Sequence, residues 1–459
     1  MGIYLLGMIL VGILDFRKTE DFTSFAVAGR TQKTLTVSMS LLATVLGAST
    51  TIGITDTVYQ IGFPGIWWLM FGALGLIFQA IFLSERVRRI GADTLPHMVE
   101  ILVGKEASVL LAVMISISWI GVVAGQLVAM HGLVTFATGS SSKLLLILIS
   151  AIVILYTVLG GQLSVVKTDR LQLIVILAGI LLCFGYLYFF RDQPAEQAST
   201  GFELLNENYT GWNLLNQCFI IGGVYFLGPD ILSRNFISKN EKTAKRAAWV
   251  SGLVLAVFAL VITLIGMWAR TYVTPEQMGD HKALLYITGI LPKWIGVILS
   301  LGLLSAILSS TDTCLINAAT IFSRDILGKK DVRIIRLVVL GIGVIAATIA
   351  ITGSGNIINI LSGAYSIYTP GVIFPLLVAI HSHRKYTIRK GIWFSAVIAG
   401  GLFGLVSTFL GDWLLEQGLP SGLVSNLSLI GMGVSLIISL ASIRRGTEHF
   451  GSHFTFLFP

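Results

Sequence analysis

One stretch of the sequence, residues 301–327, places several oxygen-bearing side chains on one face of a predicted helix. This face combines positions at helical spacings of three, four and seven with one acidic neighbour: Ala306, Ser309, Ser310, Thr313 and Asp312. Hydroxyl and backbone carbonyl oxygens are hard, neutral ligands that suit an alkali cation, and one carboxylate can supply the compensating charge. The pattern therefore predicts a cation site. A serine-rich packing seam between helices is the alternative, but an ionisable residue deep in an apolar helix favours function.

Two other stretches combine helix-breaking residues with long apolar runs. Residues 46–51 read LGASTT, and residues 219–231 read FIIGGVYFLGPDI, with glycine pairs and a Gly-Pro pair around an apolar centre. Glycine weakens a helix and proline removes a backbone donor. Unwound backbone at membrane depth is tolerated only where it lines a cavity. Both stretches are therefore predicted breaks beside a binding site.

The amino-acid composition indicates that these segments belong to a membrane protein. Of the 459 residues, 55% are hydrophobic and 12% are charged, and the mean hydropathy is +0.86. Soluble domains carry about 25% charged residues, so these values exclude a soluble globular protein. The apolar runs predict an all-α chain with thirteen spans, near 2–15, 36–60, 63–83, 106–136, 143–160, 171–190, 213–233, 248–269, 293–322, 336–352, 355–381, 391–411 and 425–443.

The distribution of basic residues predicts the orientation. If the N-terminus lies outside, 26 of the 31 Lys and Arg residues fall in inner loops. The net charge of +8 is then a topology signal, and no nucleic-acid partner is required. We expect a multi-pass protein of the plasma membrane with its N-terminus outside and its C-terminus in the cytoplasm.

The two predicted breaks fall in the second and seventh spans, five helices apart. If the short helix 2–15 is peripheral, residues 36–190 and 213–381 form two five-helix halves, followed by two additional helices over 391–443. An odd number of spans per half gives the halves opposite orientations, which is the inverted-repeat plan of secondary transporters. We expect one transmembrane domain that spans residues 1–459.

Five motifs together resemble the sodium:solute symporter family, which contains sodium-coupled proline, pantothenate, sialic acid, iodide and glucose transporters. The motifs are DFTSFAVAGR (21–30), SLLATVLGAST (40–50), YTVLGGQLSVVKTDRLQ (156–172), DILSRNFISKNEKTAKRAA (230–248) and SAILSSTDTCLINAATIFSRDI (305–326). The resemblance implies the LeuT-type fold of two inverted five-helix repeats. It also implies sodium-driven import of a small organic solute by alternating access.

The resemblance assigns two groups of cation ligands. The main sodium site would take backbone carbonyls at the first break and the carbonyl and hydroxyls of the hydroxyl face, at Ala43, Leu46, Ala306, Ser309 and Ser310. A second cation site would use Asp169, Asp312 and Thr313. The family commonly has a hydroxyl where this chain has Asp312, so the change could strengthen a second cation site or move a proton.

The solute is less determined by the sequence. By analogy with relatives, residues facing the broken helices are expected to be Gly47, Thr50, Trp67, Trp68, Gln126, Tyr225 and Tyr365. The two tryptophans could equally be anchors at the membrane interface. A small amphipathic solute is expected, such as an amino acid like proline, or a short carboxylate.

Other functions remain as alternatives. A proton-coupled symporter of the same fold is the nearest one, and an ion channel or a transporter-like sensor is less favoured, because two broken helices in opposed repeats have no role in a simple pore. No set of nucleophile, base and orienting group predicts an enzyme. The expected partners are the solute, sodium and the lipid bilayer.

Overall fold

The computed structural model describes the chain except for residues 1, 192–200, 280, 353–356, 384–385 and 446–459. The α-helices are α1 (Gly2–Asp15), α2 (Phe22–Val27), α3 (Thr34–Val45), α4 (Ile54–Ile61), α5 (Trp67–Phe82), α6 (Ser84–Ile90), α7 (Leu95–Leu102), α8 (Lys105–Thr138), α9 (Lys143–Gly185), α10 (Gly211–Leu227), α11 (Pro229–Ile237), α12 (Glu241–Tyr272), α13 (Pro275–Met278), α14 (Ala283–Ile290), α15 (Lys293–Ile321), α16 (Val332–Thr352), α17 (Ile357–Ser382), α18 (Lys390–Phe409), α19 (Gly411–Glu416), α20 (Ser421–Val424) and α21 (Leu427–Ala441). Short 3-10 and π-helical turns are η1 (Phe16–Thr19), η2 (Ala28–Arg30), η3 (Ser49–Gly53), η4 (Phe63–Ile66), η5 (Tyr186–Phe190) and η6 (Phe322–Ile326).

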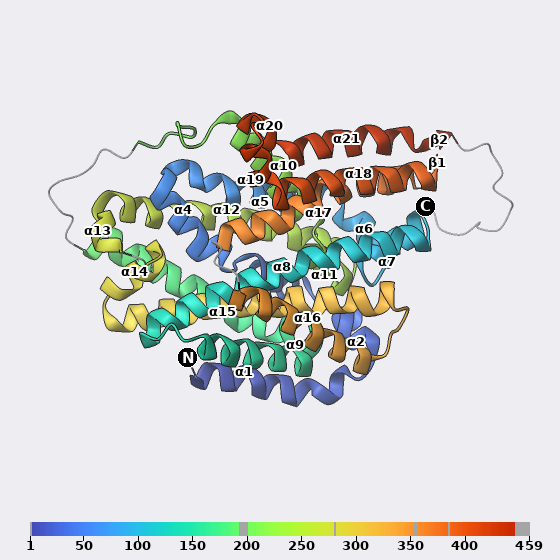
Figure 1. The fold of residues 1–459 in the computed structure, drawn as a ribbon. Helices are drawn as coiled ribbons and strands as arrows, with labels where there is room; N and C mark the ends of the chain where they lie inside the picture. The colour runs from blue at the N-terminus through green and yellow to red at the C-terminus, as the bar shows by residue number, and fades with distance from the viewer. Residues whose placement is uncertain (1, 192–200, 280, 353–356, 384–385, 446–459) are drawn as a thin grey trace.

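The long helices form one bundle along a common direction, with α1 on one side and α18 and α21 on the opposite side (Figure 1). Helix α15 lies inside this bundle, because every residue from 302 to 321 is buried. The predicted hydroxyl face therefore belongs to the central helix. Following the predicted orientation, we call the end with α13 and α14 the outer end and the end with α6 and α7 the inner end (Figure 1).

The prediction of an all-α membrane fold is confirmed, with one small addition. Strands β1 (Tyr386–Ile388) and β2 (Ile443–Arg445) pair antiparallel, with Thr387 opposite Arg444. The β-branched pair Thr387-Ile388 lies between α17 and α18, and it suits an extended backbone. Hydropathy did not predict these strands, since they lie between apolar runs.

The number of spans can be compared with the thirteen predicted. Within the described residues, nine helices are long and apolar enough to cross a membrane, or ten if the bent pair Thr34–Val45 and Ser49–Ile61 counts as one span. Helices α1 and α21, with 14 and 15 residues, are shorter than these. Thirteen therefore remains a prediction.

Helix α9 contains two of the predicted spans. Its backbone leaves helical geometry at Gly161 (φ 60°, ψ −176°). The hydroxyls of Tyr156 and Thr168 lie 2.9 Å apart. Twelve residues of straight helix would separate them by about 18 Å. The helix therefore folds back at Gly160-Gly161, and Asp169 lies on the returning arm, about two turns after Gly161.

The first predicted break is present. Helix α3 ends at Val45, Leu46 adopts a non-helical backbone (φ −87°, ψ 57°), and the chain resumes as η3 and α4 at an angle of 60°. The hydroxyls of Thr50 and Thr51 bond to the Gly47 carbonyl at 3.1 and 2.8 Å and stabilise this bend. Glycine and hydroxyl residues thus produced the break that the sequence predicts.

The second break is narrower than expected. Gly222 and Gly223 remain helical within α10, and the interruption lies at Gly228 alone (φ −61°, ψ 141°), before Pro229 begins α11. Proline at a first helical position is compatible with helix geometry because its missing N–H would be unpaired there. The Gly-Pro pair therefore separates two helices without a long loop.

Candidate cation and solute site

The hydroxyl face of α15 meets the first break directly. The Ser310 hydroxyl donates to the Thr44 carbonyl at 2.7 Å. A Cβ atom on Gly47 would lie only 2.4 Å from the Ser310 Oγ. The absence of a side chain at Gly47 thus allows the two elements to approach each other.

The backbone carbonyls at this break differ in their hydrogen bonds. The carbonyls of Thr44, Val45 and Gly47 accept from Ser310, Thr50 and Thr51. No residue that the structure describes donates to the carbonyls of Ala43 or Leu46. A buried carbonyl normally has a partner, so these two oxygens are available to a ligand. They are the two carbonyls that the sequence assigned to the main sodium site.

The α15 side of the same site supplies oxygen lone pairs. Ser309 donates its proton to the Asp169 carboxylate at 2.5 Å, and Ser310 donates to Thr44. Because each hydroxyl donates elsewhere, its oxygen can still accept a cation. Ala306 is fully buried one turn earlier on α15. The printed contact between the first break and this face of α15 is made by Ser310 with Thr44 and Gly47, next to the predicted ligands Ala43 and Leu46 in sequence.

The predicted second site contains a residue that the sequence analysis missed. The guanidinium of Arg234, on α11, donates to the Thr313 hydroxyl at 2.8 Å and to Asp169 at 3.2 Å. It also donates to the Thr44 hydroxyl. Arg234 is completely buried. A positive side chain thus lies between Asp169 and Thr313, where the sequence placed a second cation.

Asp312 lies apart from this arginine cluster. Its carboxylate is fully buried, and neither oxygen has a hydrogen-bond partner of normal geometry among the described residues. Its neighbours are the hydroxyl of Tyr156 and the carboxylate of Asp169. The structure therefore groups Thr313 with Asp169 through Arg234 but leaves Asp312 outside that group.

Several of the predicted solute residues form an aromatic group between α5, α8, α10 and α17. The ring centroid of Tyr365 lies 6.4 Å from those of Trp68 and Trp119, and Trp119 lies 5.1 Å from Tyr368. Tyr225 lies beside Trp68. We call these five residues the aromatic group. The sequence analysis did not predict Trp119 and Tyr368. In sequence, aromatic residues on long apolar helices look the same whether they line a binding site or pack in the core.

Gln126 connects this region to the first break. Its side-chain oxygen accepts from the backbone N–H of Ala48 at 3.2 Å. Its amide nitrogen would lie 3.1 Å from a Cβ on Gly47. Gly47, Thr50 and Gln126 are therefore neighbours, but the Thr50 hydroxyl donates to the backbone carbonyls of Val45 and Gly47.

Trp67 does not join the other predicted solute residues. Its indole N–H donates to the Leu204 carbonyl at 2.9 Å, and its ring stacks on Phe71 at 5.2 Å. Trp68 is buried at the next position. Adjacent residues on a helix point about 100° apart, which separates the two tryptophans.

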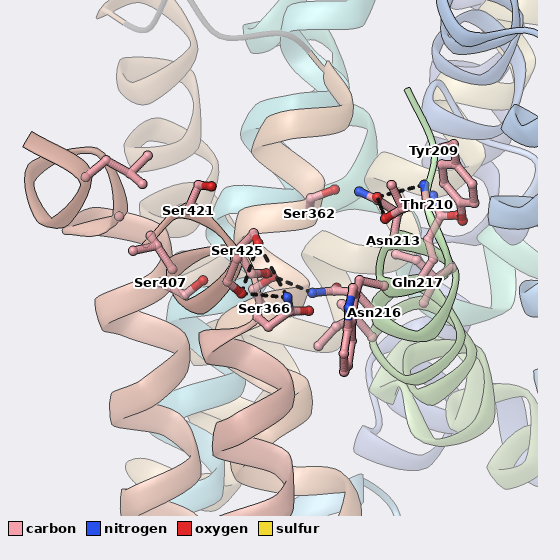
Figure 2. Close-up of a pocket in the computed structure, with 18 of the residues that line it drawn as sticks. Tyr209, Thr210, Asn213, Asn216, Gln217, Ser362, Ser366, Ser407, Ser421 and Ser425 are labelled. Atoms are coloured by element: carbon pink, nitrogen blue, oxygen red, sulfur yellow. Dashed lines mark hydrogen bonds between the residues drawn. The ribbon is translucent and has the colours of Figure 1, made fainter. Parts of the chain in front are cut away.

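A cavity of about 600 Å³ lies between the start of α10 and helices α17, α18 and α20 (Figure 2). Its walls carry amide and hydroxyl side chains from the start of α10, from α17 and α18, and from the segment around α20, including Asn213, Asn216, Ser362 and Ser425 (Figure 2). Trp68 also lines the cavity. The cavity thus reaches one member of the aromatic group, Trp68.

A network of ion pairs lies at the inner end. Asp93 contacts Arg30, and it lies 3.3 Å from His97 and 3.6 Å from both Arg324 and Lys330. Burial alone would raise the pKa of the Asp93 carboxyl, but His97 and Arg30 outweigh this effect and hold the pKa well below its usual range. Asp93 therefore stays charged and joins η2, α7 and η6.

The chain is similar to known transporters over most of its length. The family model "Sodium:solute symporter family" matches residues 25–399. The osmoregulated proline transporter OpuE of Bacillus subtilis is 25% identical over 409 residues, covering 82% of each chain. The high-affinity proline transporter PutP of the same organism is 22% identical over 480 residues, covering 97% of this chain and 99% of the relative. A Na⁺-coupled sialic acid symporter, solved in a substrate-bound outward-open state, aligns with a TM-score of 0.78 at 17% identity, over 97% of this chain and 98% of that one. This likeness in structure confirms the predicted LeuT-type fold.

Proposed function

The chain belongs to the sodium:solute symporter family and is a sodium-driven symporter of small solutes, and we propose that it imports an amino acid such as proline, or a short carboxylate. The proposed sodium ligands are the carbonyls of Ala43, Leu46 and Ala306 and the hydroxyls of Ser309 and Ser310. One observation supports this assignment. The carbonyls of Ala43 and Leu46 have no donor among the described residues, and they flank Thr44, whose carbonyl accepts from Ser310.

Such a site couples ion binding to conformation. Three of the ligands belong to α15 and two to the end of α3, so a bound sodium ion would hold the two helices together. All five ligands are neutral, which suits an ion that must be released again. The Asp169 charge lies one hydrogen bond away through Ser309 and offsets part of the ion's desolvation. Loss of sodium would then free α3 to move against α15.

We propose that one sodium ion is coupled. Arg234 already provides a positive charge between Asp169 and Thr313. A second cation there would face a buried guanidinium, and repulsion between like charges in a low-dielectric region is strong. The arginine therefore takes the place of the second ion, and Asp312 has no cation ligand role with Thr313.

The proposed path follows the predicted topology. The two halves, 36–190 and 213–381, would rearrange around the breaks, and the solute would enter from the outer cavity and pass Trp68. The proposed solute contacts are Gly47, Gln126, Trp68, Tyr225 and Tyr365. We place the protein in the plasma membrane with its N-terminus outside, in agreement with the excess of basic residues in the inner loops.

The test is uptake of radiolabelled proline and of a panel of amino acids and carboxylates into proteoliposomes, with and without a sodium gradient. Ser309→Ala should raise the sodium concentration for half-maximal uptake by roughly tenfold to a hundredfold, because one lost ligand costs about 1–3 kcal/mol. Ser305→Ala is the matched control, since Ser305 is equally buried on α15 but pairs with Tyr4. An unchanged sodium dependence in Ser309→Ala would show that the hydroxyl only packs.

A further inference from the structure

A buried carboxylate at the second break has no assigned role. Asp230 is the second residue of α11, directly after the interruption at Gly228. Its side chain is 9% exposed, and its Oδ1 atom has no hydrogen-bond partner among the described residues. This oxygen lies over the break, 2.9 Å from where a Cβ on Gly228 would be. Its position does not belong to the sodium ligands proposed above.

The groups around Asp230 do not neutralise it. Arg234 is one helical turn further along α11, but its terminal N–H groups donate to Asp169, Thr313, Thr44 and Ser233, and its Nε–H has no hydrogen-bond partner among the described residues. In the described part of the chain Asp230 forms no ion pair. The start of α11 places the backbone N–H of Ile231 beside the carboxyl group. A helix N-terminus favours negative charge by its dipole, but this accounts for only a fraction of a full charge.

Three tyrosines of the aromatic group lie near the same carboxylate. Asp230 lies within electrostatic range of Tyr225, Tyr365 and Tyr368, which come from α10 and α17. The Tyr368 hydroxyl donates to the Leu227 carbonyl at 2.7 Å, at the end of α10. The faces of aromatic rings attract cations, and substituted ammonium groups in particular. A carboxylate beside several rings is therefore suited to an alkyl-substituted ammonium group.

The outer cavity, through which we propose that the solute enters, contains no basic side chain among its described lining residues. Asp412 is the only charged residue among the described residues that line the outer cavity, and it is acidic. The remaining polar groups are amides, hydroxyls and aromatic N–H or O–H groups. A carboxylate solute without an amine would meet no positive partner along this route. A positively charged nitrogen would meet acceptors throughout.

The charges near the two breaks support the same conclusion. Three buried carboxylates, Asp169, Asp230 and Asp312, accompany one buried guanidinium, Arg234. The region is therefore short of two positive charges when all three carboxylates are ionised. One sodium ion would supply the first. A cationic solute would supply the second, a zwitterion such as proline would leave the total unchanged but place its ammonium group at a carboxylate, and a simple carboxylate would increase the deficit.

We propose that Asp230 receives a positively charged, alkyl-substituted nitrogen of the solute, with the aromatic group around it, so that the protein selects amines and rejects short carboxylates that lack one. This inference rests on the proposed sodium-coupled symport and narrows its solute class. Asp230 then determines specificity, while Ser309 and Ser310 determine sodium affinity.

The test measures binding by thermal unfolding of the purified full chain in sodium buffer and in potassium buffer. The probes are proline, glycine betaine, choline and propionate. At least one amine probe should raise the unfolding temperature of the wild type in sodium buffer, and propionate should not. Asp230→Asn should weaken the apparent affinity for that probe by roughly tenfold to a hundredfold, the scale for removing one partner of a buried charge pair.

Three further measurements keep the outcome clear. Stabilisation by sodium without any probe should be equal in the wild type and in Asp230→Asn, which shows that the variant is folded. Asp230→Glu, which keeps the charge, should retain more amine affinity than Asp230→Asn. Asp331→Asn removes an exposed carboxylate at the start of α16 and should bind the probes as the wild type does.

The proposal is overturned if propionate binds as well as the amines, if Asp230→Asn binds the amine probe as tightly as the wild type, or if none of the three amines binds. A different result would count against the proposed sodium site rather than against the role of Asp230. If sodium fails to stabilise the wild type and Ser309→Ala behaves like the wild type, then the sodium site is wrong, whatever the probes do.

Discussion

Substitution of Gly47 by alanine isolates the contact on which the proposed sodium site depends. The backbone of Gly47 is not in the left-handed region that only glycine favours, so alanine adds no conformational strain there. Its methyl group would instead lie 2.4 Å from the Ser310 Oγ and 3.0 Å from the Ser310 Cβ, where ordinary contacts begin at 3.4 Å. The hydroxyl must therefore retreat by about 1 Å, which removes it from ligand position.

The expected consequence for Gly47→Ala is a weaker sodium site in a folded protein. A displaced ligand costs about 1–3 kcal/mol, so the sodium concentration for half-maximal uptake should rise roughly tenfold to a hundredfold. The amide of Gln126, 3.1 Å from the same methyl group, would also shift, so the solute KM should rise as well.

The assay is uptake into proteoliposomes over a series of external sodium concentrations at an inside-negative membrane potential. Sodium-dependent thermal stabilisation is the second measurement. Gly341→Ala is the matched control, because its added methyl group would meet no heavy atom within 4 Å. If Gly47→Ala and Gly341→Ala had the same sodium dependence, Ser310 could not be a ligand at this position, and the proposed contact between α3 and α15 would carry no ion.

Three more predictions follow from individual contacts. Arg234→Gln should raise the Hill coefficient of uptake for sodium, because it removes the positive charge beside Thr313, and an unaltered coefficient would argue against the single-ion proposal. Asp93→Asn should lower the unfolding temperature at pH 7. Because the folded-state pKa of the Asp93 carboxyl is depressed, its ion pairs stabilise the protein above the unfolded-state pKa of about 4, and this stabilisation is lost progressively as the pH falls below that value. The unfolding temperatures of the wild type and of Asp93→Asn should therefore converge in acid. A difference in unfolding temperature that stays constant with pH would contradict the ion-pair assignment. Gly400→Ala should destabilise the packing of α18 on α17, because its methyl group would lie 2.1 Å from the Pro370 carbonyl, and an unchanged unfolding temperature would disprove this close contact.

The features of the fold that the sequence predicted have local chemical causes. Glycine with hydroxyl neighbours at 46–51 and the Gly-Pro pair at 228–229 interrupt helices by their own backbone preferences, and the structure has breaks at both places. The turn at Gly160-Gly161 has the same origin, since Gly161 adopts a positive φ. The spacing of Ser309 and Ser310 placed them on one helix face without any knowledge of neighbouring helices.

The unpredicted features depend on which helix packs against which face. Trp67 and Trp68 are adjacent in sequence, and only the packing of α5 shows that one faces Leu204 and the other faces Tyr365. The hydropathy pattern of α5 is apolar on all sides, so it could not distinguish their directions.

Buried charge was the least predictable property of the site. Arg234 follows a predicted span and precedes a run of inner-loop lysines, so positive-inside counting assigned it to the surface. Its burial arises because α11 packs between α3, α9 and α15, whose side chains supply Thr44, Asp169 and Thr313 as partners. The loss of hydration of a buried charge must be offset by such partners. Asp312 lacks them among the described residues. Whether a charged residue here is hydrated, paired with a neighbour or free to bind a ligand therefore depends on contacts with three helices that are distant in sequence. Only the packed structure distinguishes an arginine that marks the inner side of the membrane from one that belongs to the binding site.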